Sequence, residues 1–186
     1  MQIVLLRHGM SEIYTDHKMS AHEYGRWVRE YNRAGIDLSF APPVDAVDMA
    51  QQCDFVVCSD LPRSLESARA LGIRHIDVTD SLFREFEIPY AHRPWPKLSA
   101  SSWTVLFRLL WLLGYSRNSE TFAEAKGRAR LCMSRLLEYA QQSGTVLFVG
   151  HGSLLWYLDS LLRQSGWQSE SLSPRRHWQY GHYFMS

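Results

Sequence analysis

The chain contains 186 residues, a length typical of one domain. Its 20 Lys and Arg residues against 19 Asp and Glu residues leave a net charge of +1, which excludes a bulk polybasic nucleic-acid binder but allows a local basic pocket. Hydrophobic residues at 46% and charged residues at 21% are enough for a core and exclude a disordered chain.

The pattern of apolar residues predicts strands that alternate with helices. A short apolar run predicts a strand over residues 1–6, which stops at Arg7-His8-Gly9. The further predicted elements are a helix over residues 24–34, a strand over 54–58, a helix over 62–71, a strand over 74–78, a helix over 120–142, a strand over 145–149, a helix over 154–162 and a last strand, at an edge, over 178–185. This alternation is typical of a layered α/β fold with a mainly parallel sheet.

Neither the N-terminus nor the longest apolar stretch predicts membrane association. No secretory signal precedes Arg7, and the apolar stretch over residues 103–113 contains Arg108 and is too short to span a bilayer. Three cysteines without paired spacing make a disulfide framework or a structural zinc site improbable. We therefore expect a cytoplasmic protein without membrane or nucleic-acid partners.

Three predicted strand ends carry polar and basic residues. They are Arg7-His8-Gly9, the stretch from Ser59 to Arg63, and Gly150-His151-Gly152. In parallel sheets, ligands bind beyond the carboxyl ends of the strands. Two histidines and two arginines from distant parts of the chain are thus expected to converge there.

These residue types suit phosphate chemistry. A neutral imidazole such as that of His8 is a competent nucleophile toward phosphorus, and Gly9 allows a ligand to approach the backbone. Arg63 falls in the first turn of a predicted helix, where backbone N–H groups and the guanidinium both suit an anion. Each residue also has an ordinary structural explanation, such as a backbone partner for His8 or a surface pair between Arg63 and Glu66.

Other chemistries fit the stretch around His151 less well. Ser153 lacks the flanking glycines of a serine-hydrolase elbow. The stretch also lacks the third glycine of a dinucleotide loop and the lysine of a P-loop. A metal site built on His8 and His151 has no obvious third ligand in the sequence.

Taken together, three segments resemble the ordered signatures of the histidine phosphatase superfamily, also called the phosphoglycerate-mutase-like family. They are Leu6-Arg7-His8-Gly9, the stretch from Ser59 to Ala68, and Val149-Gly150-His151-Gly152. The resemblance implies one three-layer α/β/α domain over residues 1–186, with a helical cap insertion at about residues 89–128.

The resemblance also implies a role for each matching residue. His8 would be the nucleophile that forms a phosphohistidine, Arg7 and Arg63 would bind the phosphoryl oxygens, and His151 would donate a hydrogen bond or positive charge to them. Ser11 would add a hydrogen bond to the phosphate. Phosphoryl transfer depends on positioning and charge neutralisation, so this set needs no metal and no cofactor. The implied activity is hydrolysis of a small phosphomonoester.

The family further uses an acidic residue as proton donor to the leaving group. The spacing favours Glu85, directly after Arg84, over Glu87. Apolar Phe83 and Phe86 beside it suit a general acid. The alternative is that Glu85 is an ion-pair partner of Arg84 or of another surface cation.

Two positions depart from the family's pattern. Tyr14 stands where many members have a polar residue, and Pro89 stands where many have glycine. Both departures disfavour one alternative, a phosphoglycerate-mutase-type phosphotransferase. The complete set of Arg7, His8, Arg63, Glu85 and His151 disfavours the other, a non-catalytic phospholigand-binding module.

Two further segments allow two interpretations each. The apolar residues 103–113 predict a buried cap helix, or else a wall of the substrate pocket or a dimer face. Arg175-Arg176-His177 predicts a solvated turn, or else a segment that reaches the mouth of the pocket. The sequence predicts no oligomeric state.

Overall fold

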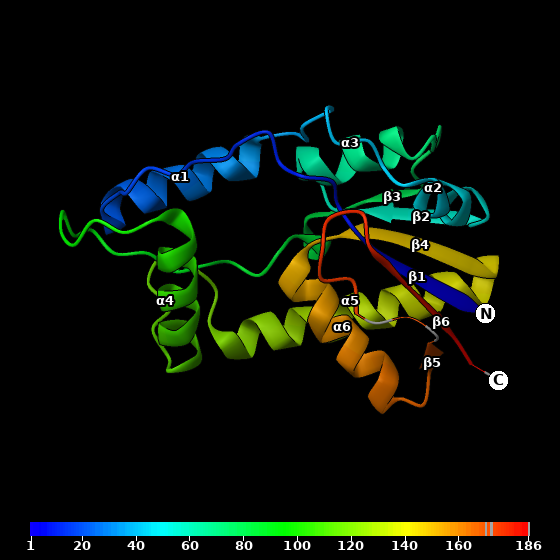
Figure 1. Ribbon diagram of the computed structural model, residues 1–186. Coiled ribbons are helices and arrows are strands. Elements are labelled where there is room, and N and C mark those ends of the chain that lie inside the picture. The colour runs from blue at the N-terminus through cyan, green and yellow to red at the C-terminus, as the bar shows by residue number, and fades with distance from the viewer. Residues whose placement is uncertain (170, 172, 186) are drawn as a thin grey trace. The chain divides into compact units, whose positions relative to one another are not determined.

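The computed structural model describes residues 1–169, 171 and 173–185. The chain forms two compact units, the first made of Met1–Glu12, Gly35–Glu85 and Arg128–Ser186 and the second of Ile13–Ala34 and Phe86–Gly127. The elements in chain order are β1 (Gln2–Arg7), α1 (Ala21–Arg33), α2 (Val44–Gln51), β2 (Phe55–Cys58), α3 (Pro62–Ala70), β3 (Val78–Thr79), the 3-10 turn η1 (Ser81–Phe83), α4 (Ala100–Leu112), α5 (Phe122–Ser143), β4 (Thr145–Gly150), α6 (Gly152–Gln164), β5 (Gln168–Ser169) and β6 (Tyr180–Phe184) (Figure 1).

The first unit is built on one sheet, whose order across the described residues is β3-β2-β4-β1-β6-β5. The four strands β3, β2, β4 and β1 are parallel, whereas β6 is antiparallel to β1 and β5 is antiparallel to β6. The predicted mainly parallel α/β class is therefore confirmed. The register pairs Arg7 with Gly150 and Cys58 with Val149. The carboxyl ends of β1, β4 and β2 thus lie next to one another.

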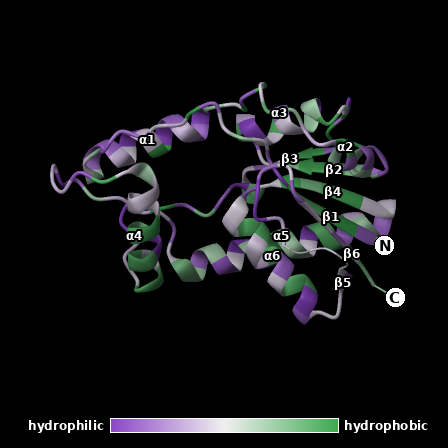
Figure 2. Ribbon diagram, in the orientation of Figure 1, coloured by the Kyte–Doolittle hydropathy of each residue, from purple (hydrophilic) through white to green (hydrophobic). Residues whose placement is uncertain are grey.

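Helices cover both faces of this sheet, with α2 and α3 on one face and α5 and α6 on the other (Figure 1). Strand side chains alternate between the two faces of a sheet, and the residues of β2, β4 and β1 are mostly apolar, which is typical of a parallel sheet covered on both faces (Figure 2). The core beside α2 and α3 includes Val4, Leu6, Val56, Leu147, Val149, Ala50, Ala68 and Leu71. On the other face, Phe55 stacks on Tyr139 of α5.

Several predicted elements differ from the observed ones at sheet edges and helix starts. The strand predicted over residues 74–78 is reduced to β3, Val78–Thr79. The prediction that the last strand lies at an edge is wrong, because the two-residue β5 pairs with β6 on its outer side. Helix α2 and strand β5 were not predicted, since short elements carry too few apolar residues for a periodic signal.

The second unit packs aromatic side chains between α1 and α4. Helix α1 begins at Ala21, earlier than predicted, because Ser20 and Glu23 form a capping box. Helix α4 buries a stripe of side chains spaced three or four residues apart, Ala100, Trp103, Phe107 and Trp111. The first three pack in one cluster with Tyr24, whereas the ring of Trp111 contacts those of Phe86 and Phe122. Its other apolar side chains are exposed at Val105, Leu106, Leu109 and Leu112. The apolar stretch therefore contributes one buried face and one exposed face.

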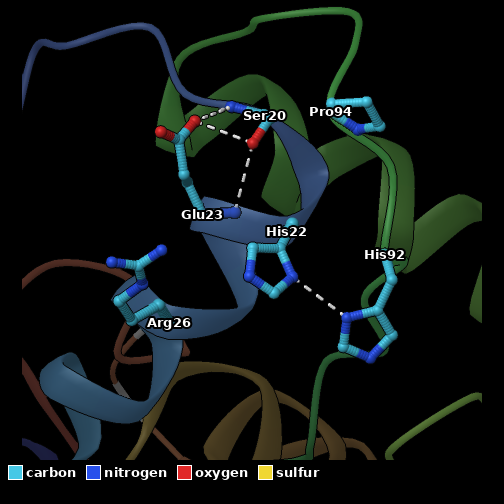
Figure 3. A pocket seen from close by; sticks show the side chains of 6 residues that line it. All are labelled: Ser20, His22, Glu23, Arg26, His92 and Pro94. Carbon is cyan, nitrogen blue, oxygen red and sulfur yellow. Dashed lines mark hydrogen bonds between the residues drawn. The ribbon is translucent and has the colours of Figure 1, made fainter.

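An open pocket of about 250 Å³ lies in the second unit, beside the start of α1. Ser20, His22, Glu23, Arg26, His92 and Pro94 line it (Figure 3). Nδ1 of His22 lies 3.0 Å from Nδ1 of His92, and the Glu23 carboxylate accepts hydrogen bonds from the backbone and hydroxyl of Ser20. None of the residues predicted to bind phosphate lines this pocket.

No helix among the described residues is long and apolar enough to cross a membrane.

The burial of the central strands predicts a large difference between two identical substitutions. Leu147 of β4 is fully buried, whereas Leu109 of α4 is 55% exposed. We expect Leu147→Ala to lower the free energy of unfolding by about 2 to 5 kcal/mol, because it removes buried methyl groups and leaves a cavity. Leu109→Ala should change it by less than about 0.5 kcal/mol. Urea denaturation of both variants measures the difference, and equal losses would contradict the assignment of the core.

Candidate active site

His8 follows directly after β1 and is buried. Its backbone N–H donates to the carbonyl of Gly150, 3.0 Å away, so the sheet register fixes its main chain. Its Nδ1 lies 2.7 Å from the carbonyl oxygen of Gly9. A carbonyl only accepts hydrogen bonds, so Nδ1 carries the proton and Nε2 of the neutral ring keeps its lone pair. The ring is thus held in the tautomer that a nucleophilic Nε2 requires.

His151 lies between β4 and α6 and is fully buried. Its ring centroid is 5.1 Å from that of His8, with the planes tilted by 57°. Nε2 of His151 lies 2.7 Å from the hydroxyl oxygen of Ser59, at the end of β2. Its Nδ1 is buried and has no hydrogen-bond partner among the described residues. A buried polar atom without a partner is costly, and a bound ligand oxygen would satisfy it.

Two arginines accompany the histidines. Arg63 lies in the first turn of α3 and is 1% exposed. The guanidinium of Arg7 lies against the start of α6, where a Cβ added to Gly152 would stand 3.3 Å from Cζ of Arg7. Arg7 also donates to the backbone carbonyl of Arg175. Arg63 thus lies at the N-terminus of α3, and Arg7 lies against the N-terminus of α6. Both guanidiniums are near backbone N–H groups of a helix start, an arrangement that suits an anion.

Ser67 of α3 connects these groups. Its hydroxyl accepts from the backbone N–H of Gly9 at 2.8 Å and donates to the carbonyl of Arg63 at 2.6 Å. Gly9 itself has no room for a side chain, because an added Cβ would lie 2.3 Å from Cζ2 of Trp178. The glycine after His8 is therefore required by the packing of Trp178.

Burial and the nearby positive charges lower the pKa of both buried imidazoles. Burial and then the charge of Arg63 lower the pKa of His8 well below its ordinary value. Burial, then His8 and Arg63, lower the pKa of His151 in the same way. Both rings are consequently neutral near pH 7, and the positive charge of the site resides on the guanidinium groups.

Glu85 is placed at the N-terminus of α6. Its two carboxylate oxygens accept backbone N–H groups of Ser153 and Leu154, at 2.9 and 3.0 Å. Because these residues follow His151 and Gly152, the carboxylate belongs to the same side-chain cluster. A carboxylate at a helix N-terminus is also favoured by the helix dipole.

The segment before Glu85 is held by α5. Arg128 donates to the carbonyl oxygens of Leu82, Arg84 and Glu85, at 2.9, 2.7 and 3.2 Å. Arg84, the cation that the sequence offers to Glu85, makes a bidentate ion pair with Asp60 at 2.6 and 2.5 Å.

The remaining predicted residues are divided between the two units. Ser11 is buried in the first unit and forms a backbone bridge with Ile36. Glu87 belongs to the second unit, where its carboxylate accepts the backbone N–H of Glu120 at 2.8 Å. Tyr14 and Pro89, the two departures from the family pattern, also belong to the second unit. Glu85 is thus the acid that shares a unit with His8.

Three residues of the cluster have no predicted role. Ser59 and Ser67 lie inside the second motif, and Arg128 lies in the predicted helix over residues 120–142, outside any motif. For the segment with His177 the sequence allows a solvated turn or a segment that reaches the mouth of the pocket, and a fully solvated turn is wrong for His177. Arg175 and Arg176 are exposed, but His177 is half-buried with its ring centroid 5.2 Å from that of His8.

Among the described residues there is no group of three or more His, Cys, Asp and Glu side chains arranged to hold a metal ion. Nδ1 of His8 and Nε2 of His151 already bond to Gly9 and Ser59.

Fold and cluster together define an α/β protein with two imidazoles and two guanidiniums gathered at the ends of parallel strands. The family model of the histidine phosphatase superfamily (branch 1) matches residues 46–177. Because this match covers more than half of the chain, the chain belongs to that superfamily. The match confirms the resemblance seen in the sequence. Arg63, Glu85, His151 and His177 lie within the matched residues, and His8 precedes them.

Solved structures share the fold. A mycobacterial glucosyl-3-phosphoglycerate phosphatase is similar over 88% of this chain and 79% of its own, with 21% identity and a TM-score of 0.57. A protein described as mycobacterial hydrolase 2 is similar over 88% of this chain and 72% of its own, with 22% identity and a TM-score of 0.60. The α-ribazole phosphatase of Shigella flexneri is similar over 87% of this chain and 79% of its own, with 20% identity and a TM-score of 0.56. A comparison with curated proteins finds no match.

The lowered pKa values predict how stability depends on pH. An unfolded histidine titrates near pH 6.5, whereas His8 and His151 stay neutral in the folded chain until lower pH. Below about pH 6.5 the unfolded state therefore binds more protons, and folding stability falls as the pH falls, by up to about 1.4 kcal/mol per pH unit for each histidine. Stability is restored as the pH rises above 6.5.

We expect His151→Asn to reduce this slope by one histidine's share, whatever its effect on the absolute stability. Urea denaturation at a series of pH values between 7.5 and 5 measures the slope. A variant with the slope of the wild type would show that His151 is not buried in its neutral form.

Proposed function

We propose that the protein is a phosphatase that hydrolyses a small phosphomonoester through a phosphohistidine on His8, without a metal or cofactor. The observation that carries the proposal is the state of His8: a neutral ring with the proton on Nδ1, beside the buried guanidinium of Arg63 and the ring of His151. The superfamily assignment supports it, as does the fold shared with two phosphatases whose names denote organic phosphomonoesters.

In the first step, the lone pair on Nε2 of His8 attacks phosphorus. The N–P bond forms while the ester P–O bond breaks, and the leaving oxygen takes a proton from Glu85. Arg7 and Arg63 neutralise the charge on the equatorial oxygens, and Nδ1 of His151 supplies a hydrogen bond to one of them. Ser11 adds a further hydrogen bond to the phosphate.

In the second step, a water molecule attacks the phosphohistidine. Its oxygen forms the new P–O bond, the N–P bond returns its electrons to Nε2 of His8, and the proton of the water passes to Glu85. The net reaction converts ester and water into alcohol and phosphate. The contacts of its carboxylate with the amides of Ser153 and Leu154 hold Glu85 at the start of α6, next to His151 in the chain.

Turnover of phosphomonoesters tests the proposal. We expect the wild type to hydrolyse aryl and alkyl phosphates in the presence of a metal chelator, and His8→Ala to lose at least about a thousandfold in kcat, because no other group replaces a covalent nucleophile. The control is His75→Ala, a removal of a histidine whose side chain is 83% exposed. Rapid quenching should trap an acid-labile phosphoryl group on the wild type.

Three outcomes would overturn parts of this proposal. Activity that survives in His8→Ala excludes the nucleophile, and activity lost with the chelator excludes the metal-free route. A wild type that binds inorganic phosphate but turns over no ester is a phospholigand-binding module. A wild type that transfers the phosphoryl group to an added alcohol in preference to water is a phosphotransferase.

The role of Glu85 predicts a dependence on the leaving group. We expect Glu85→Gln to slow the hydrolysis of alkyl phosphates at least about tenfold more than that of nitrophenyl phosphate, because a poor leaving group needs a proton and a good one does not. Glutamine keeps an acceptor for one α6 amide, and denaturation checks that the variant is folded. Equal losses on both substrates would assign Glu85 to the capping of α6 alone.

A further inference from the structure

The segment Arg175 to Gln179 contacts the end of β1 and the residues that follow it, His8 and Gly9. Two backbone hydrogen bonds join the segment and the end of β1: the N–H of Trp178 donates to the carbonyl of Arg7 at 3.0 Å, and the N–H of Arg7 donates to the carbonyl of Gln179 at 2.9 Å. The indole of Trp178 lies against Gly9 and donates to the carbonyl of Phe40 at 3.0 Å. The residues before and after His8, Arg7 and Gly9, are therefore both in contact with this segment.

His177 makes the contact that reaches His8 itself. Its Nδ1 lies 2.9 Å from the main-chain carbonyl oxygen of His8, and the two rings are 5.2 Å apart with a tilt of 48°. Because a carbonyl only accepts, Nδ1 of His177 must carry the proton. The main chain of His8 is consequently held on both sides, through its N–H by Gly150 and through its carbonyl by His177.

The backbone at this point is strained. Trp178 has a φ of 65°, in the left-handed region that residues other than glycine and asparagine seldom adopt. A residue other than glycine keeps such a conformation only where surrounding contacts impose it. Here it places His177 on His8 and Trp178 on Gly9, in two consecutive residues.

We propose that His177 is a positioning residue for the nucleophile: its Nδ1–H fixes the carbonyl of His8, and its ring packs against the His8 ring, so that Nε2 of His8 keeps its orientation toward phosphorus. The inference rests on the proposed function. His177 acts through His8, whereas Arg7, Arg63 and His151 contact the phosphate. Its loss should therefore lower the rate of phosphorylation of His8 and leave phosphate binding nearly unchanged.

Two substitutions separate the hydrogen bond from the ionisable ring. Asparagine at position 177 retains an N–H donor near the place of Nδ1 and carries no titratable proton, whereas leucine fills similar space without a donor. We expect His177→Asn to keep kcat within about threefold of the wild type. His177→Leu should lose about ten- to a hundredfold in kcat, the scale expected for a misplaced reacting group.

The readouts are single-turnover formation of phosphohistidine with nitrophenyl phosphate and the inhibition constant of inorganic phosphate. The inhibition constant should change by less than about threefold in both variants, and denaturation checks that both are folded. If His177→Asn is as slow as His177→Leu, the ring of His177 transfers protons and the positioning role is wrong. If His177→Leu has wild-type kcat, His177 has no role in the reaction.

A spectroscopic measurement tests the proposal without turnover. The ¹⁵N chemical shifts of the His8 ring report which nitrogen carries the proton. We expect the wild type and His177→Asn to show the proton on Nδ1, and His177→Leu to show a mixture of tautomers, because the carbonyl of Gly9 is then less firmly placed. An unchanged spectrum in His177→Leu overturns the positioning role. An inactive wild type with the expected spectra overturns the phosphatase proposal alone.

Discussion

The parallel register of β1, β4 and β2 is the constraint on which the candidate site depends. Arg7 pairs with Gly150 and Cys58 pairs with Val149, so the three strands end at one level. The polar residues that follow each strand, His8, His151 and Ser59, are brought together by this pairing although they are far apart in the sequence. A shift of one residue in this register would reverse which side chains face each layer and would separate the groups.

Charge in this protein is concentrated more than its total suggests. A net charge of +1 over 186 residues includes the guanidiniums of Arg7 and Arg63 beside two imidazoles that burial keeps neutral. Neutral imidazoles avoid adding two more positive charges to a buried space, where like charges repel most strongly. Such a site suits the proposed reaction, because the guanidiniums attract an anion while the neutral ring of His8 keeps a lone pair on Nε2.

The residues that follow a buried strand or lie in a motif are the parts of this site that can be predicted from the sequence. The apolar runs before Arg7 and His151 are long enough to indicate buried strands, and Pro62 marks the start of α3. Side chains that act through the backbone, such as Arg128 on the Glu85 segment and His177 on His8, leave no local signal, because their partners are carbonyl groups far away in the chain. The edge strands β3 and β5 are too short for any periodicity.

The two contacts of Glu85 with the start of α6 have a consequence for how such a chain changes through mutation. In the proposed reaction Glu85 transfers a proton, and in the structure it also caps α6, so two constraints act on this position. A descendant that no longer needed catalysis would still lose folding stability on losing this carboxylate. Retention of the acid in a relative would therefore indicate an intact α6 start as much as an intact reaction.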